Sequence, residues 1–158
     1  EVVARLRSAD QTVLMLDGDE MREMFGANTA NNSNHERDER MTLAMQYAKL
    51  CKLIALQGVT VVCSTISMFK EVYSWNRENQ PNYFEVYLKV PFSELRNRDP
   101  KGIYRRFDSG ELSNVAGLDL QVDEPKSPDI LFEFEPNHKL SDMVEETLIK
   151  LSKEERNL

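Results

Sequence analysis

The chain has few of the residues that mark several protein classes. Its 158 residues include two cysteines, two histidines and one tryptophan, and acidic residues outnumber basic ones by 27 to 20, which gives a net charge of −7. That balance argues against non-specific binding to a nucleic acid polymer or to an anionic membrane. No apolar run approaches the roughly 20 residues that a membrane-spanning helix needs, and no signal peptide is visible. A cytoplasmic enzyme or binding protein fits these absences.

The two cysteines lack the spacing of a metal site or of a redox motif. Cys51 falls in a helical pattern, and Cys63 falls in an apolar run typical of a strand. We therefore interpret both as buried, reduced thiols.

What the chain does have is a regular alternation of apolar runs and helical patterns. The apolar runs predict buried strands at residues 11–16, 59–64, 83–90 and 129–134. The helical patterns predict helices at residues 20–25, 36–57, 68–79, 92–98 and 140–151. This alternation favours a doubly wound α/β fold, with a mainly parallel sheet that helices cover on both faces. The length and the 41% apolar content fit one domain, residues 1–158.

Residues 99–119 are the basic part of this acidic chain. The segment combines a proline-glycine turn with three cationic side chains, Lys101, Arg105 and Arg106, and two further glycines come later. This composition predicts an ordered but mobile loop. Such a concentration of positive charge indicates an anionic ligand, and the obvious one is a transferring phosphoryl group.

Two aspartates follow the first predicted strand, at the edge where doubly wound sheets bind their ligands. At Asp17, a carboxylate can hold a magnesium-bound water or accept the proton of a substrate hydroxyl. Asp19 is explained nearly as well by capping of the helix that follows. Arg22 lies one helical turn later on the same face as these carboxylates.

Several motifs, in the correct order, resemble the adenylylsulfate kinase family. They are D-G-D-E-M-R at 17–22, S-T-I-S at 64–67, R-D-P-K-G at 98–102 and G-L-D at 117–119. Members of the family are P-loop kinases that phosphorylate the ribose 3′-hydroxyl of a nucleotide sulfate. The resemblance runs from residue 17 to about residue 129. It implies a P-loop NTPase-like fold, ATP and Mg²⁺ as cofactors, and residues 99–119 as a lid.

The resemblance also implies a catalytic set. Asp17 is placed at the reacting hydroxyl, and Lys101 neutralises charge on the transferring oxygens. Ser67 is the position at which a phosphoserine intermediate has been considered in the family, although direct transfer needs none. Ser67 is read equally well as the N-cap of the helix predicted at 68–79. No metal-ligating residue is assigned.

The remaining implied roles are binding roles. The residues placed at the nucleotide substrate are Asp19, Arg22, Arg37, Arg40, Ile66, Ser67 and Val115. Two arginines are placed at ATP. Arg98 suits stacking on the adenine, and Arg105 suits charge neutralisation at the phosphates.

Three positions depart from the family pattern. Arg40 stands where the family has asparagine, Met68 where it has proline, and Val115 where it has an aromatic residue that stacks on the substrate adenine. The anion-handling residues Asp17 and Lys101 are retained, as are Arg22 and Arg37. We therefore expect a 5′-modified nucleotide as the small-molecule partner, and a substrate that can differ from adenylylsulfate.

Three alternatives remain open. Within the kinases, they are a cytidine diphosphoramidate kinase of capsule biosynthesis and a kinase of a non-nucleotide alcohol. From another class, the chain could be a non-catalytic nucleotide-binding regulator. A homodimer is also left open.

The start of the chain adds one expectation. Residues 1–8 read as the end of an amphipathic helix without an N-cap, and no G-x-x-x-x-G-K-[ST] sequence occurs anywhere. We therefore expect a further strand and a phosphate-binding loop before residue 1. The alternative is a degenerate relative without that loop.

Overall fold

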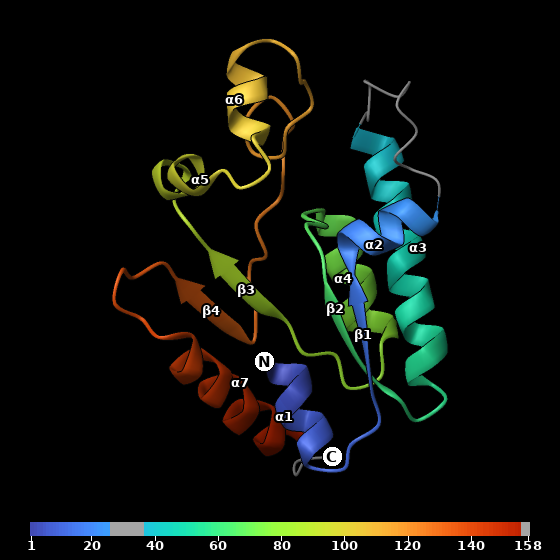
Figure 1. Ribbon diagram of the computed structural model, residues 1–158. Coiled ribbons are helices and arrows are strands. Elements are labelled where there is room, and N and C mark those ends of the chain that lie inside the picture. Colours follow the sequence, from blue (N-terminus) through green and yellow to red (C-terminus); the bar gives the residue numbers. More distant parts are fainter. Residues whose placement is uncertain (26–36, 156–158) are drawn as a thin grey trace.

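The computed structural model describes residues 1–25 and 37–155, in which each strand is both preceded and followed by a helix (Figure 1). In chain order the elements are α1 (Val2–Ser8), β1 (Val13–Asp17), α2 (Gly18–Met24), α3 (Arg37–Ala55), β2 (Thr60–Ser64), α4 (Lys70–Asn79), β3 (Val86–Lys89), α5 (Phe92–Arg98), α6 (Ile103–Asp108), β4 (Ile130–Glu133) and α7 (Leu140–Glu155). The predicted strands and helices are all present, with bounds that differ by a few residues. The prediction that the strands are buried is wrong in part, because Met15 of β1 is 48% exposed and Leu88 of β3 is 59% exposed. Residue 36 of the predicted helix 36–57 lies outside the described residues.

The strands form two parallel pairs, which agrees with an α/β fold. β1 pairs with β2 from Val13 opposite Thr60 to Asp17 opposite Ser64, and β3 pairs with β4 from Val86 opposite Ile130. Within the described residues, no hydrogen-bonded ladder joins the two pairs. All four strands run towards the side of the molecule on which α2, α5 and α6 lie (Figure 1). Their carboxyl ends therefore share one edge, as the sequence predicts for a ligand site.

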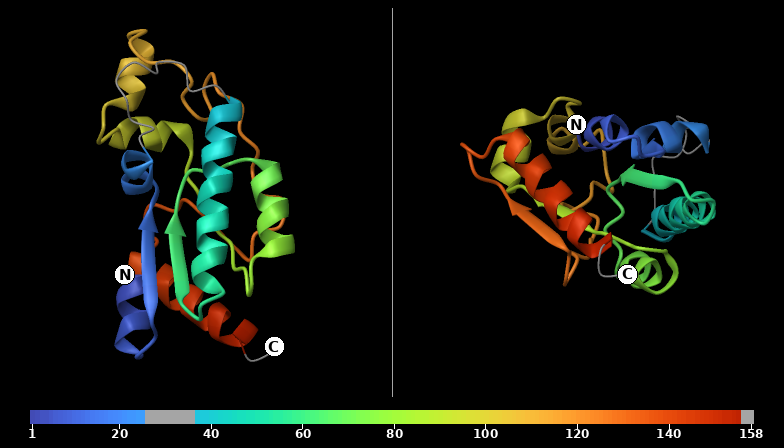
Figure 2. Two further views of the ribbon diagram at one scale, coloured as in Figure 1. Left: turned by 90° about the vertical axis from the view of Figure 1, so that its right-hand side faces the viewer. Right: turned by 90° about the horizontal axis from the view of Figure 1, so that it is seen from below.

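Helices hold the strand pairs in place. α3 and α4 lie together beside β1 and β2, and α1 packs on β1 and α7 (Figure 2). A buried apolar cluster joins α3 to α4, and its members are Ala44, Ala48, Phe69 and Val72, with Met41, Met45 and Trp75 packed against them. No helix in residues 1–25 and 37–155 is long and apolar enough to cross a membrane.

The prediction that Ser67 caps the helix at 68–79 is wrong. α4 begins at Lys70, and the N-cap position is occupied by Phe69, whose side chain makes no capping bond. The Lys70 N–H instead donates to Asp123 Oδ2 at 3.1 Å. A carboxylate distant in the sequence supplies the acceptor that was expected from Ser67.

The predicted basic loop contains a helix. The Asp99 carboxylate, which is buried, accepts from the backbone N–H groups of Tyr104 and Arg105 at 3.2 Å each, and so holds the first turn of α6. Further along, Gly117 has φ of +80°, and a Cβ there would lie 2.6 Å from Cζ of Phe92. The segment is therefore anchored at both ends by specific contacts.

The prediction of two buried cysteines is wrong in part. Cys51 is half-buried and Cys63 is exposed, although both are free thiols as predicted. α3 packs on β2 and brings the two thiols into contact, and the hydrogen bond with Cys51 raises the pKa of the Cys63 thiol. Cys63 is exposed because β2 pairs with β1 alone among the described strands.

Candidate active site

Asp17 lies at the junction of β1 and α2 and is the N-cap of α2, so the prediction that Asp19 caps this helix is wrong, and Asp19 lies in the first turn. Both carboxylate oxygens of Asp17 are engaged. Oδ1 accepts from the N–H groups of Asp19 at 2.9 Å and Glu20 at 3.4 Å, and Oδ2 accepts from the Ser64 hydroxyl at 3.2 Å. The β1–β2 register explains the last bond, because it places Asp17 directly opposite Ser64. Gly18 allows this close approach, since a Cβ there would lie 3.0 Å from the Ser64 carbonyl oxygen.

These bonds fix the charge state of Asp17. The N–H groups of Asp19 and Glu20 lower the pKa of its carboxyl below the ordinary value of 3.8, and Ser64 and Lys101 act in the same direction. Asp17 is therefore a carboxylate at neutral pH, held in one orientation at the carboxyl end of a strand. A group of this kind binds and orients a hydroxyl, or a cation, better than it stores a proton.

An ion pair connects the lid to this strand end. Lys101 Nζ donates to Asp19 Oδ2, across 82 residues of sequence, and both side chains are largely exposed. The structure thus brings Asp17, Asp19 and Lys101 together, as the motifs predict. Arg105, also in the lid, is 83% exposed, with its Nε 3.6 Å from Asp99 Oδ2.

A second cluster contains the arginines Arg22 and Arg40. Arg40 is half-buried, and burial and the neighbouring Arg22 both lower the pKa of its guanidinium, against the attraction of Asp119. The Asp119 carboxylate accepts from the N–H groups of Asn114 and Val115 at 2.7 Å each. The turn that carries Val115 is therefore fixed, and both Asp119 and Arg22 lie near enough to Arg40 to act on its pKa.

Arg37 is fixed by other means. Its Nη2 donates to Asp123 Oδ2 at 2.8 Å and lies 3.6 Å from Glu71 Oε2, and the guanidinium lies over the Phe69 ring at 5.3 Å. Two other predicted substrate residues follow β2, where Ile66 is 74% exposed and Ser67 is half-buried.

Arg98 is held at the end of α5. Its Nε donates to Glu94 at 2.6 Å, and its guanidinium lies over the Phe134 ring at 5.1 Å. Arg98 therefore already stacks on an aromatic ring of the protein, and its placement at an adenine stays a prediction.

Known protein families include one whose sequence pattern this chain matches. A sequence profile described as adenylylsulphate kinase matches residues 1–133, most of the chain. The chain belongs to the adenylylsulfate kinase family. As a member of this kinase family, the protein is a phosphotransferase with a P-loop NTPase fold.

The curated relatives include kinases that are named for two different nucleotides. A cytidine diphosphoramidate kinase from Campylobacter jejuni is 34% identical over 148 residues, which cover 94% of this chain and 84% of the relative. An adenylyl-sulfate kinase from Clostridium kluyveri is 30% identical over 132 residues, which cover 83% of this chain and 64% of the relative.

Solved structures of the family share the fold. The APS kinase of Mycobacterium tuberculosis, solved in complex with AMPPNP and APS, superimposes with a TM-score of 0.83 at 24% identity. The match covers 96% of this chain and 86% of that one.

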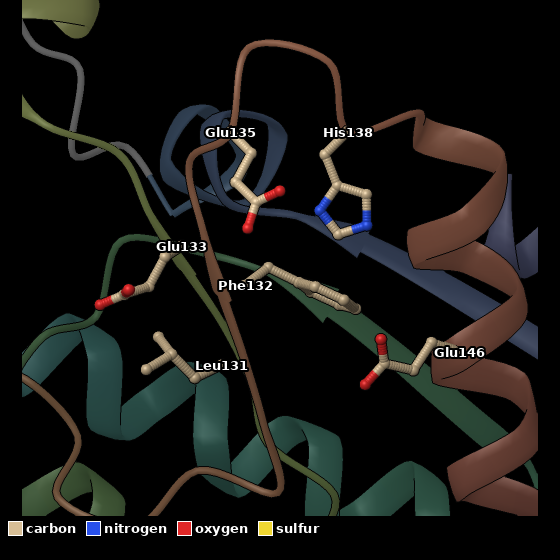
Figure 3. A pocket seen from close by; sticks show the side chains of 6 residues that line it. All are labelled: Leu131, Phe132, Glu133, Glu135, His138 and Glu146. Atoms are coloured by element: carbon tan, nitrogen blue, oxygen red, sulfur yellow. The ribbon is translucent and has the colours of Figure 1, made fainter.

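A separate pocket lies away from the predicted family residues, none of which lines it. Its walls are Leu131, Phe132, Glu133, Glu135, His138 and Glu146 (Figure 3). Glu135 and His138 come from the turn after β4, and Glu146 comes from α7. Three glutamates disfavour a phosphate-bearing ligand, so the candidate active site is at the carboxyl ends of β1 and β2 instead.

Sequence reasoning assigned no role to three carboxylates that support the family residues. Asp99, Asp119 and Asp123 accept backbone N–H groups and organise the segments that carry Arg105, Val115 and Arg37. A signal was available for Asp99, since it stands before a proline and a glycine at the start of α6. No local signal existed for Asp123, because its partners are 53 and 86 residues away.

Proposed function

We propose that the protein transfers the γ-phosphate of ATP to the ribose 3′-hydroxyl of a 5′-modified nucleotide. The observation that carries this proposal is Asp17, which is charged, oriented and placed at the carboxyl end of β1. Asp17 orients the attacking hydroxyl in this proposal. Lys101, which lies in the lid and reaches Asp19, neutralises charge on the transferring oxygens. Ser67 needs no covalent role, because positioning and charge suffice for direct transfer.

The residues present fit a magnesium ion held mainly by nucleotide phosphates. Among residues 1–25 and 37–155 no group of three metal-ligating side chains occurs, and kinases need only one or two carboxylates for Mg²⁺. Asp17 Oδ2 accepts one hydrogen bond, so it retains a lone pair for a metal-bound water. An ion bound there would supply neutralisation of charge on the phosphate oxygens.

The phosphates of ATP need a cradle that residues 1–158 do not encode, since they contain no G-x-x-x-x-G-K-[ST] sequence. The two strand pairs are both parallel, and within the described part of the chain no hydrogen-bonded ladder joins them. These features support a preceding strand and glycine loop in the same kinase domain. The test is ATP affinity, measured by calorimetry for residues 1–158 and for the product of the complete gene. Equal affinities would contradict this part of the proposal.

The choice of nucleotide has two candidates, and a cytidine 5′-diphosphoramidate is favoured over adenylylsulfate. Val115 cannot stack on a base as an aromatic residue does, and stacking is worth roughly 1–3 kcal/mol. Arg40 offers only donors, which suits the carbonyl of a cytosine edge. The 34% identity with the Campylobacter cytidine diphosphoramidate kinase supports the same choice. A cytoplasmic location and a role in capsule biosynthesis go with this proposal.

Steady-state kinetics with ATP and each nucleotide test the proposal. We expect turnover of the cytidine compound with a kcat/KM that exceeds the value for adenylylsulfate by about one order of magnitude or more. Efficient turnover of adenylylsulfate, without turnover of the cytidine compound, would instead show that the protein is an adenylylsulfate kinase. Turnover of neither nucleotide would leave the non-catalytic regulator as the better description.

A further inference from the structure

Asp123 joins three segments of the chain, in the stretch between the lid and β4. Its Oδ2 accepts from Arg37 Nη2 at 2.8 Å and from the Lys70 N–H at 3.1 Å. Its own N–H donates to the Met68 carbonyl oxygen at 2.9 Å. One carboxylate therefore connects the first described turn of α3 to the first turn of α4.

The anchoring of Arg37 is one-sided. Nη2 is the atom that approaches both Asp123 and Glu71, and the Phe69 ring supports the guanidinium from one face. For Nε and Nη1, the described residues provide no hydrogen-bond partner, and the side chain is 31% exposed. A guanidinium has five N–H donors in a fixed plane, so holding one nitrogen orients the donors on the others.

The charge of Asp123 is needed at this position as well as its shape. The N-terminus of α4 carries a partial positive charge and repels a guanidinium placed beside it. Asp123 lies between the two and is attracted to both. The Lys70 N–H and Arg37 lower the pKa of the Asp123 carboxyl, so it stays ionised at neutral pH.

We propose that Asp123 is a positioning residue for nucleotide binding, which holds Arg37 through Nη2 and leaves Nε and Nη1 to bind an anionic group of the substrate. This inference rests on the proposed function, in which Arg37 binds the nucleotide. It adds that the affinity for the nucleotide depends on a carboxylate that does not touch the substrate. Asp123 acts on binding rather than on the transfer step, because Arg37 is not among the groups assigned to the reacting oxygens.

The variant Asp123→Asn tests the inference in the complete enzyme. It retains an acceptor oxygen for the Lys70 N–H but loses the charge that holds Arg37. We expect KM for the nucleotide to rise roughly tenfold or more, the size typical of removing an orienting partner, with kcat within about twofold. Asp123→Glu, which keeps the charge, should recover part of the affinity. Glu124→Gln is the matched control, because the neighbouring Glu124 pairs with Lys89 and not with Arg37.

A double-mutant cycle separates positioning from a general loss of structure. If Asp123 acts through Arg37, then adding Asp123→Asn to the Arg37→Lys variant should raise its KM little further. An unchanged KM in Asp123→Asn would overturn the inference. The inference would also fail if Asp123→Asn raised KM by the same factor in the Arg37→Lys variant as in the wild type. Failure of the wild-type enzyme to turn over either nucleotide would defeat the proposed function. Normal wild-type turnover with a normal KM in Asp123→Asn would defeat this inference alone.

Discussion

Replacing Lys101 with methionine separates the structural role of the lid lysine from its role in phosphoryl transfer. The Lys101 and Asp19 side chains are 60% and 62% exposed, and an ion pair so exposed contributes about 0.2–1 kcal/mol to stability. A charged donor at the transferring oxygens, by contrast, is worth about 10²–10³ in kcat. We therefore expect Lys101→Met to lower kcat by about 10²–10³ and the unfolding midpoint by at most about 4 °C.

The assay is steady-state ATP turnover with the nucleotide varied, accompanied by thermal unfolding followed by circular dichroism. Lys89→Met is the matched control, because Lys89 forms a comparable exposed ion pair with Glu124, at 2.8 Å, on β3. Asp19→Asn removes the partner and keeps the Lys101 charge, so it should retain most of kcat. A kcat for Lys101→Met within threefold of wild type, or an equal loss in Lys89→Met, would refute the reasoning.

Four further predictions concern the site and the segments that support it. Asp17→Asn should lower kcat by about 10² or more with ATP affinity unchanged by calorimetry. Because its pKa is lowered from 3.8, the Asp17 charge is lost only as the pH falls below that value, so a pH–rate profile should show no loss from this group down to about pH 5. Gly117→Ala should reduce the free energy of unfolding in urea by about 1–3 kcal/mol more than Gly110→Ala, since both have positive φ but only Gly117 faces an aromatic ring. Val115→Phe with Arg40→Asn should raise kcat/KM for adenylylsulfate by about 10–100-fold, and an unchanged value would contradict the assigned roles.

Much of the fold could be predicted because its signals are local. Apolar runs of strand length marked β1 to β4, and helical spacing marked α3 and α7, since both patterns depend only on neighbouring residues. The position of Asp17 followed from the same logic, because the end of a parallel strand is where such folds bind ligands. The ion pair between Asp19 and Lys101 was not predicted. The family motifs only place both residues at one site.

The parts that were missed depend on contacts between distant residues. The start of α4 was misplaced because Asp123, 53 residues beyond Lys70, supplies the capping oxygen that Ser67 was expected to provide. α6 was taken for a loop because its first turn depends on the buried Asp99 carboxylate. Cys51 and Cys63 lack a motif spacing, but α3 packs on β2 and brings their thiols together.

The position of the transferred phosphate tests the central claim most directly. The complete enzyme is incubated with ATP and with the 5′-modified cytidine nucleotide or adenylylsulfate, and the product is examined by ³¹P–¹H correlation NMR. The account predicts a new phosphate on the ribose 3′-oxygen of at least one nucleotide, formed by wild type and almost lost in Asp17→Asn. A phosphate on another oxygen, or a 3′-phosphate formed at an undiminished rate by Asp17→Asn, would contradict it.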